Sequence, residues 1–534
     1  MLFISSHRMH GQPDGYHDAR DGRTVSMSAA CGYTDTASYP DPTTAPFGRF
    51  DYFFSKAPMP DHDVSTTAAL DALGDAMVDQ APGDVDNTDV PAIITYLGQF
   101  IDHDITAGTD RVQGFSDVDI DDVAPLSRAD VVASVANFRT GVLDLDSLYG
   151  GATLQGQFAS EMTKRLRHPS FPAKLRIGTD ANVLTSGPRP SRPRPRHEDP
   201  AHDLLRAERL IRDHDPILDP AAIDRLPADL KAFLTDPDSG EINPSRAIIA
   251  DGRNDENLAV ATVHLAFARL HNRLVDQAPA GTSDEQFDWA RTRLRWIYQW
   301  LLVNEYLPSV CHGPTLAGII AAEAPVYAQF LRRVGAEGRR LPLPLEFSVA
   351  AFRFGHSTAR ADYDWNANFG RADPGGTALI ERAPFQLMFA FTGEGEMNEG
   401  ADPRLPAGWI VDTERFTVAG EGAFSDRNTR LIDTHIAPPL HDMLNEPAGF
   451  HNVLKRLPRR NLRRGQRLAL PSAQACIAGL AASGISIDPL SPEQLASGGT
   501  GQALVDGGFV EATPLWFYIL KEAEVVTGGQ RLGP

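Results

Sequence analysis

The sequence of residues 96–104 is Tyr96-Leu97-Gly98-Gln99-Phe100-Ile101-Asp102-His103-Asp104. At about 3.6 residues per turn, Gln99 and His103 are i,i+4 neighbours that point the same way from a helix. Apolar residues recur beside this polar pair at helical spacing, namely Ile93, Ile94, Leu97, Phe100 and Ile101. The stretch therefore predicts a buried amphipathic helix that carries an amide, a carboxylate and an imidazole at its end. An imidazole buried in an apolar wall is a candidate for proton transfer.

The tripeptide Asp-His-Asp occurs three times, at 61–63, 102–104 and 213–215. The first and third copies lie among Pro, Asp and Arg residues without a periodic apolar face, so we interpret them as solvated loops. Only the middle copy lies on a predicted helix. Taken alone, this segment favours a packed, structural histidine over a catalytic one, and both interpretations stay open at this point.

Length and composition indicate a soluble globular protein. The 534 residues can bury a large core, in one large helical domain or in more than one domain. Hydrophobic residues make up 42% and charged residues 22%. The net charge of -20 repels nucleic acid and anionic membranes at long range, so we expect neither as a partner. No apolar stretch approaches the roughly 20 residues of a membrane span.

The three cysteines, Cys31, Cys311 and Cys476, are too few for a disulfide framework and lack zinc-ligand spacing, so we expect free thiols. Residues 1–16 contain a short apolar run followed by polar residues and lack the apolar region of a secretory signal. A cytoplasmic protein is the default expectation, and export without a signal stays open.

We expect a mainly α protein, because no alternating pattern is sustained enough for a large sheet. Residues 1–85 are rich in Gly, Pro, Asp and Thr and are interpreted as an irregular arm. Residues 86–485 would form the main domain, and residues 486–534 an extension packed on it. Within residues 168–200, the sequence Pro188-Arg189-Pro190-Ser191-Arg192-Pro193-Arg194-Pro195 predicts an extended linker.

Further helices are predicted from apolar spacing and end signals. One begins near Pro91, whose fixed φ suits a first helical turn. Another covers 255–277, with acidic residues in its first turn. The next opens on a capping box at Ser283 and ends at Pro308. Residues 321–335 and 473–482 add two more.

A second group of polar residues surrounds the start of the helix at 255–277. Arg253 is expected just before this helix and Glu256 in its first turn. A guanidinium there could stabilise negative charge that develops on a bound oxygen. It could equally form an ion pair with Glu256, and these residues alone do not separate the two interpretations.

Two more stretches carry candidate ligand residues. His356 follows Phe352-Arg353-Phe354-Gly355, and a neutral imidazole in such a setting is a good axial ligand for haem iron. A lone histidine near phenylalanines is, however, more often a packed core residue. Asn461 lies in the strongly basic run 455–467, which suits a solvated face, a phosphate or the propionates of a haem.

Together these stretches resemble the animal haem peroxidase family of the peroxidase–cyclooxygenase superfamily, in particular its bacterial members. The resemblance covers roughly residues 90–480 in the expected order. It rests on Tyr-Leu-Gly-Gln-Phe-Ile-Asp-His-Asp at 96–104, Arg-Asn-Asp-Glu-Asn at 253–257, His-Asn-Arg-Leu at 271–274, Phe-Arg-Phe-Gly-His at 352–356 and Arg-Asn-Leu-Arg-Arg-Gly at 460–465. It implies a mainly α fold with haem between core helices, and a catalytic domain at 86–485.

The resemblance also implies roles for single residues. His103 would be the distal acid and base, Arg253 its charge-stabilising partner, and Gln99 the distal amide that orders water or a halide. His356 would be the proximal iron ligand, with Asn461 holding its orientation.

Other residues would bind the haem itself, which is either haem b or an ester-linked haem. Asp102 and Glu256 match the carboxylates that form ester links to haem methyl groups in mammalian peroxidases. Asn257 stands where those proteins have a methionine that forms a sulfonium link, so that third bond cannot form here. Arg353 and Arg464 are the expected cations near the cofactor.

A calcium site is implied by the same comparison. Asp104 and the loop residues Thr140, Val142, Asp144 and Asp146 match the family's ligand set, with Val142 using its carbonyl oxygen. Hard oxygen ligands suit Ca²⁺. Without the resemblance, an Asx-rich turn would be the simpler interpretation of this loop.

The implied function is a haem peroxidase that reduces hydrogen peroxide and, through a ferryl intermediate, oxidises small donors such as phenols, halides or pseudohalides. A fatty-acid dioxygenase of the same superfamily is the first alternative, but it would need a tyrosine three residues before His356, where this chain has Arg353. A haem-binding protein without turnover is the second, and it would not need the distal residues. The sequence indicates neither the physiological donor nor the oligomeric state.

Overall fold

The computed structural model describes most of the chain. It covers residues 15–17, 24–26, 48–79, 87–106, 123–137, 139–150, 156–181, 201–219, 239–335, 341–372, 376–393, 403–420, 422–443 and 452–534, with a few further positions between 120 and 236. Cys31 and the proline-rich run at 188–195 lie outside the described residues, so the predictions made for them stay predictions.

The described part of the chain is mainly helical, which confirms the predicted fold class. Its α-helices are α2 (Thr66–Ala76), α3 (Ile93–Ile105), α4 (Arg128–Ser134), α5 (Asp146–Tyr149), α6 (Gly156–Leu166), α7 (Ala207–Arg212), α10 (Leu258–Val275), α11 (Ser283–Leu301), α12 (Leu307–Val310), α13 (Gly313–Ala321), α14 (Pro325–Val334), α15 (Leu345–Val349), α16 (Gly355–Thr358), α17 (Thr413–Thr417), α18 (Asn452–Lys455), α19 (Leu457–Arg467), α20 (Ala473–Ala482), α21 (Pro492–Leu495), α22 (Gly498–Asp506) and α23 (Leu515–Thr527).

The strands are short and form small pairs. β3 (Gly48–Asp51) pairs antiparallel with β5 (Ala136–Asn137) and parallel with β8 (Leu343–Pro344). The other pairs, all antiparallel, are β1 (Gly15–His17) with β2 (Thr24–Ser26), β4 (Asn87–Pro91) with β11 (Asn428–Arg430), β6 (Arg167–His168) with β7 (Phe171–Leu175), and β9 (Asp362–Tyr363) with β10 (Ala383–Pro384).

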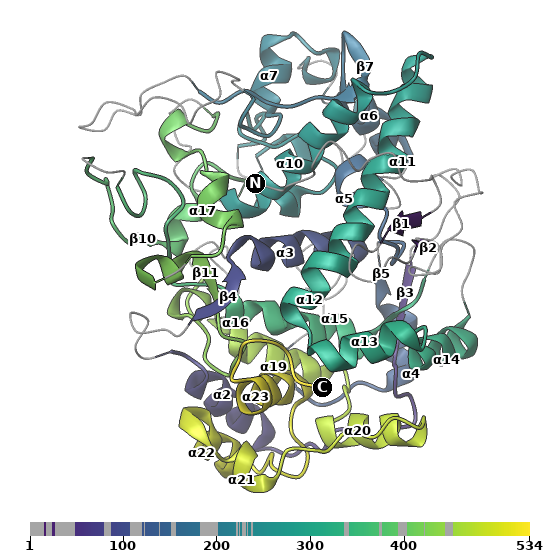
Figure 1. The fold of residues 1–534 in the computed structure, drawn as a ribbon, viewed down its shortest axis with the longest axis vertical. Helices are drawn as coiled ribbons and strands as arrows, with labels where there is room; N and C mark the ends of the chain where they lie inside the picture. Colours follow the sequence, from purple (N-terminus) through teal and green to yellow (C-terminus); the bar gives the residue numbers. More distant parts are fainter. Residues whose placement is uncertain are drawn as a thin grey trace.

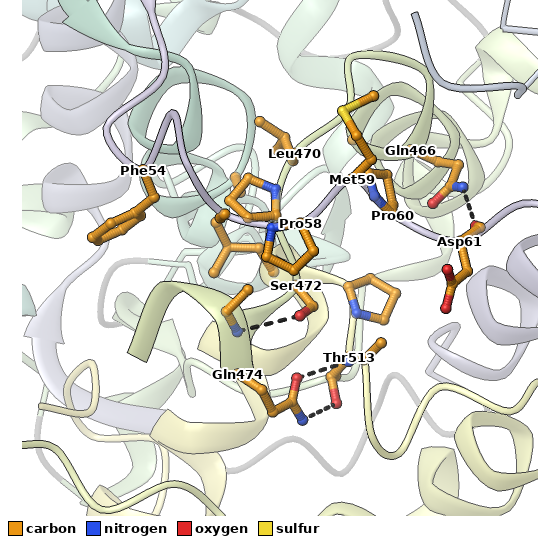
Figure 2. A pocket seen from close by; sticks show the side chains of 18 of the residues that line it. Phe54, Pro58, Met59, Pro60, Asp61, Gln466, Leu470, Ser472, Gln474 and Thr513 are labelled. Carbon is orange, nitrogen blue, oxygen red and sulfur yellow. Dashed lines mark hydrogen bonds between the residues drawn. The ribbon is translucent and has the colours of Figure 1, made fainter. Parts of the chain in front are cut away.

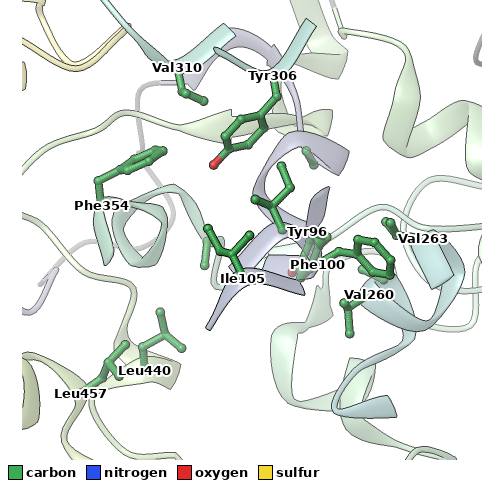
Figure 3. Close-up of a cluster of buried hydrophobic side chains, with 14 of the residues drawn as sticks. Tyr96, Phe100, Ile105, Val260, Val263, Tyr306, Val310, Phe354, Leu440 and Leu457 are labelled. Atoms are coloured by element: carbon green, nitrogen blue, oxygen red, sulfur yellow. The ribbon is translucent and has the colours of Figure 1, made fainter. Parts of the chain in front are cut away.

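Helix α3 crosses the middle of the molecule (Figure 1). It packs against α10 on one side and against α16 on the other. Its apolar face is fixed by aromatic contacts, since Phe100 stacks on Phe267 at 5.0 Å between ring centroids and meets Tyr298 edge-on at 6.2 Å. Figure 3 shows Tyr96, Phe100, Val260 and Val263 in this core. Burial of such rings is the main force that holds α3 inside the protein.

Several predicted helix boundaries are wrong by a few residues. Pro91 ends strand β4, and α3 begins only at Ile93. The predicted helix at 255–277 is α10 at 258–275, preceded by a 3-10 turn, η2 (Gly252–Asp255), so Glu256 lies before the helix. The capping box of α11 is formed by Thr282 and Glu285, one residue earlier than predicted. Residues 473–482 form a helix with the predicted bounds.

Helical structure continues through Pro308, so the prediction that a helix ends there is wrong. A π-helical turn, η3 (Leu302–Tyr306), follows α11, and Leu307 N–H bonds to Leu302 O across five residues. Pro308 then occupies the first turn of α12, where a missing N–H costs little. Two irregular regions also contain regular structure, because α2 lies within residues 1–85 and β7 lies within 168–200.

The three Asp-His-Asp copies differ as predicted. Residues 61–63 are exposed and lie outside helices and strands. The third copy follows the end of α7, where His214 is exposed and has a positive φ of 54°. Only the copy at 102–104 lies on a helix, with His103 3% exposed and Asp104 fully buried.

Candidate functional site

The polar face of α3 carries Gln99 and His103, as the sequence predicts. His103 is buried and Gln99 is half-buried. Asp102 lies on the neighbouring face and accepts a hydrogen bond from Thr106 Oγ1 at 2.9 Å. The end of α3 therefore presents a carboxylate, an imidazole and an amide to the segments packed around it.

Asn254 connects two buried histidines. Its Oδ1 lies 2.9 Å from Nδ1 of His103, and its Nδ2 lies 3.2 Å from Nδ1 of His264. Burial lowers the pKa of His264 to about 4, so this ring is neutral at pH 7 and accepts the amide N–H. An amide oxygen can only accept, so Nδ1 of neutral His103 carries the proton and Nε2 is the nitrogen that can take one up. Asn254 was not predicted as a site residue from the sequence, although it lies beside Arg253.

The guanidinium of Arg253 is held by Asp251 and by the end of α3. Its Nε and Nη2 donate to Asp251 at 3.1 and 2.8 Å. Nη2 also donates to the backbone oxygens of His103 at 3.0 Å and Thr106 at 2.8 Å. Asp251 is thus an ion-pair partner of Arg253 that was not predicted from the sequence. The structure brings Arg253 and His103 together, as the prediction requires.

Asp251 is itself buried between two arginines, since Arg139 also donates to it. Burial alone would raise the pKa of Asp251, but the charges of Arg253 and Arg139 more than offset this and hold it well below its usual range. Asp251 is therefore ionised at neutral pH. Asp251 was not predicted from the sequence, because its importance depends on Arg139, which lies far away along the chain.

Two residues that follow Arg253 hold the Gln99 amide. Gln99 Nε2 donates to Glu256 Oε2 at 2.9 Å, and Asn257 Nδ2 donates to Gln99 Oε1 at 3.1 Å. Asn257 is also the N-cap of α10, where its Oδ1 accepts the Val260 N–H at 2.9 Å. Glu256 precedes the helix because this cap defines the helix start. The amide of Gln99 is thus oriented by both neighbours.

His356 is the second residue of the short helix α16 and is half-buried. Its Nδ1 lies 2.9 Å from Nδ2 of Asn461, which comes from α19, so the predicted pair is brought together. The ring also meets Trp516 edge-on, at 6.4 Å between ring centroids. Trp516 belongs to α23 and was not foreseen, because it lies 160 positions from His356 in the sequence.

The arrangement around Asn461 suits a metal bound to Nε2 of His356. Metal binding at Nε2 requires a proton on Nδ1, which then needs an acceptor. Asn461 Oδ1 is buried and has no hydrogen-bond partner. A 180° rotation of this amide would bring Oδ1 to the Nδ1 proton and give the oxygen its missing partner. The residues therefore fit an axial ligand of haem iron with its supporting acceptor.

The two expected cations are both buried near this group. Arg353 is 7% exposed in the 3-10 turn η4 (Ala351–Phe354), directly before α16, and its Nε donates to Ser348 O at 3.1 Å. Arg464 is 5% exposed and follows Asn461 by one turn of α19. The distal and proximal segments are neighbours, since α16 packs on α3 and Thr95 Oγ1 lies 2.8 Å from Thr358 Oγ1.

The predicted calcium residues also converge in part. Asp104, Asp144 and Asp146 are all buried. Burial raises the pKa of Asp104 to about 7, and it raises the pKa of Asp144 well above its usual range. The negative charge of Asp146 is the next cause in both cases. In the same loop, the Val142 N–H lies 3.3 Å from Thr140 Oγ1. As they stand, however, no three His, Cys, Asp or Glu side chains in the described part of the chain form a group that could hold a metal ion.

Part of the chain is similar to known haem peroxidases. The family model "Animal haem peroxidase" matches residues 226–392, a stretch that contains Arg253 and His356 but neither α3 nor Asn461. "Heme peroxidase 2" of Caenorhabditis elegans is 30% identical over 125 residues, which are 23% of this chain and 17% of that protein's length.

Solved structures are similar to this chain at low sequence identity. A fatty acid alpha-dioxygenase from Arabidopsis thaliana has a TM-score of 0.50 at 12% identity, covering 94% of this chain and 74% of that one. Peroxidase A from Dictyostelium discoideum has a TM-score of 0.49 at 14% identity, covering 89% and 82%. None of the described helices has the length and apolar character to cross a membrane.

Proposed function

We propose that this chain is a haem peroxidase which reduces hydrogen peroxide with electrons from small donors. The match of residues 226–392 to the animal haem peroxidase family model supports the proposal. The donors would be phenols, halides or pseudohalides. One observation carries the proposal: Asn254 holds Nδ1 of buried His103 in the protonated form, so that Nε2 is the proton acceptor. A peroxidase needs a base of this kind at the peroxide.

The chain's own residues would move one proton and stabilise one charge. His103 Nε2 accepts the proton of the inner peroxide oxygen and delivers it to the outer oxygen, which leaves as water. Arg253 is positioned by Asp251 beside the same end of α3 and would stabilise the negative charge that builds up as the O–O bond breaks. Gln99, held by Glu256 and Asn257, would orient water or a halide.

His356 would hold the haem iron through Nε2, and Asn461 would fix the orientation of that ring. When bound, the haem supplies the redox chemistry that these side chains lack. Asp102 and Glu256 would be the candidate ester partners of the haem, and Arg353 and Arg464 would be the cations that bind its propionates.

The peroxidase is favoured over the dioxygenase of the same fold by the residue three positions before His356. Arg353 stands there, and its guanidinium is buried and donates to Ser348 O. An arginine cannot supply the tyrosyl radical that the family's oxygenases use. Fatty acid with dioxygen should accordingly give no oxygenated product, whereas guaiacol with peroxide should be oxidised.

We also propose that Asp104, Thr140, Val142, Asp144 and Asp146 bind Ca²⁺. The buried carboxylates Asp104, Asp144 and Asp146 lie close enough to repel one another, and Asp144 Oδ1 is buried without a hydrogen-bond partner. A hard cation would relieve both the repulsion and the missing contact. The proposal requires the loop 140–146 to close around the ion on binding.

An absorption spectrum before and after peroxide tests the main proposal. Iron-replete protein should show a Soret band that changes when peroxide is added without a donor. His103→Ala should keep the band and lose most of the reaction rate, typically about 10²- to 10⁴-fold for a general acid and base. His62→Ala is the matched control, because His62 belongs to an exposed Asp-His-Asp copy. A colourless protein, or a His103→Ala variant that reacts as the wild type does, would contradict the proposal.

A further inference from the structure

A cavity of about 1120 Å³ opens on the side of the molecule that carries His356. Its walls come from the segment 53–63, from α14, α19 and α20, and from residues 507–516 before and at the start of α23. Figure 2 shows Pro58, Met59 and Leu470 on one wall and the hydrogen-bonded pair Gln474 and Thr513 on the other.

Two residues of the cavity wall, Asn461 and Trp516, also contact His356. Asn461 lies 2.9 Å from its Nδ1, and the ring of Trp516 meets the imidazole edge-on. Trp516 is only 3% exposed and is fixed by a hydrogen bond from its Nε1 to Arg353 O at 3.1 Å. Trp516 thus contacts both the cavity and the candidate iron ligand.

The lining suits a small neutral aromatic molecule. Apolar groups such as Phe54, Pro58, Met59 and Leu470 provide surface for a ring. Ser472 and Gln466 offer polar groups for a hydroxyl. Cations and carboxylates both occur at the cavity, so no single charge is favoured.

We propose that this cavity binds a phenolic electron donor and that Trp516 carries the electron from the donor to the haem. This inference rests on the proposed function, because haem oxidised by peroxide is the electron acceptor. Indole is among the most easily oxidised side chains, and Trp516 both lines the cavity and contacts His356. Arg353 O is a weak base, so Trp516 keeps its Nε1 proton and passes on only an electron.

The overall reaction balances in atoms and electrons. Trp516 gives one electron to the oxidised haem and regains one from the phenol, which releases its hydroxyl proton to solvent and leaves as a phenoxyl radical. Two phenols per peroxide supply two electrons and two protons, so one hydrogen peroxide yields two waters. Halides, which are small, would react at the His103 side and bypass Trp516.

A pair of alanine variants on one helix tests the cavity. Ala478 lines the cavity and is exposed on α20, so Ala478→Trp should fill the entrance without disturbing the core. Ala481→Trp is the matched control, since Ala481 is exposed on the same helix and is not a lining residue. Calorimetric titration of guaiacol should show binding to wild type and Ala481→Trp, and at least about tenfold weaker binding to Ala478→Trp. Equal binding by both variants would overturn the cavity assignment.

A second pair tests the electron path. Trp516→Phe keeps an aromatic ring in place, and Trp409→Phe is the control in a buried aromatic cluster away from the cavity. Peroxide should generate an electron paramagnetic resonance signal that narrows when the protein contains ring-deuterated tryptophan. The signal should be lost in Trp516→Phe and kept in Trp409→Phe, and kcat/KM should fall about tenfold for guaiacol but not for iodide.

The outcomes separate this inference from the proposed function. A tryptophan radical that persists in Trp516→Phe, or guaiacol oxidation that is unchanged there, would overturn the electron path even though the Soret band and the peroxide reaction remain. Loss of the Soret band in the wild type would instead remove the proposed function and this inference with it.

Discussion

The buried pairing of Asp251 with two arginines gives a prediction that needs no cofactor. Arg139 is fully buried and Arg253 is 12% exposed, and both donate to Asp251. In Asp251→Asn, the amide oxygen can keep the bonds that Oδ1 now makes to the backbone N–H and Nε of Arg253. The amide nitrogen, however, would face the Nη2 donors of both arginines. The variant therefore loses two charge-assisted bonds and the negative charge that lies between two buried cations.

The size of the effect follows from that loss. Breaking a buried ion pair by removing one partner costs about 3–5 kcal/mol. At about 2.1 cal/mol/K per residue, a chain of 534 residues has an unfolding entropy of about 1.1 kcal/mol/K, so Tm should fall by about 3–4 °C. Differential scanning calorimetry at pH 7 measures this directly. Asp362→Asn is the control, because it breaks a pair with the exposed Arg382 that is worth only about 0–1 kcal/mol.

The pH dependence provides an independent check with a definite sign. The pKa of folded Asp251 lies below its ordinary value of 3.8, so its contribution to stability is complete above that value and is lost as the pH falls further. The difference in Tm between wild type and Asp251→Asn should thus be constant from pH 5 to 8 and shrink below about pH 4. A Tm loss no larger than that of Asp362→Asn, or a difference that grows toward acid pH, would refute the reasoning.

Three further predictions follow from other contacts. Asn254→Leu removes the acceptor at His103 Nδ1, so the stopped-flow rate with peroxide should fall at least about tenfold while the Soret band stays; an unchanged rate would show that the tautomer is set elsewhere. Gly98→Ala would place a methyl group 2.6 Å from the Tyr306 hydroxyl. This clash should lower the free energy of unfolding, measured with denaturant, by about 1–3 kcal/mol. Gly318→Ala is the control and should not destabilise the protein, because there is open space around Gly318. Chelation with EGTA should lower the Tm of the wild type, and added Ca²⁺ should restore it. Asp146→Asn should remove this response. A wild-type Tm that EGTA does not change would contradict the calcium site.

The sequence predicted those features that depend on neighbours within one turn of helix. The spacing of Gln99 and His103 placed both on one face of α3, and the apolar stripe predicted its burial, because helix periodicity fixes both. The helix at 473–482 was predicted for the same reason. Predicted helix starts were wrong where a residue one or two positions away from the predicted start is the actual N-cap. Thr282 takes this position in place of Ser283, and Asn257 takes it in place of Asp255.

Features that depend on contacts between distant parts of the chain were not predictable in this way. Pairing of His356 with Asn461 was expected only through the family resemblance, since no local rule relates positions 105 residues apart. Neither Asp251 nor Trp516 could be identified from the local sequence, because the role of each depends on a partner that the fold brings close. Asp251 binds Arg139, and Trp516 contacts His356.

These missed residues share one physical role: each fixes a group that the sequence already identified. Asp251 holds the Arg253 guanidinium, Asn254 sets the proton position on His103, and Trp516 packs against His356. A mobile functional group loses conformational entropy when it adopts its catalytic geometry. Buried, hydrogen-bonded neighbours reduce this loss because they hold the group in that geometry before the reaction. Conservative substitution of these supporting residues should therefore reduce activity more than their exposure alone suggests. Replacing a carboxylate with an amide, for example, keeps the shape of the site but releases the group that the carboxylate holds.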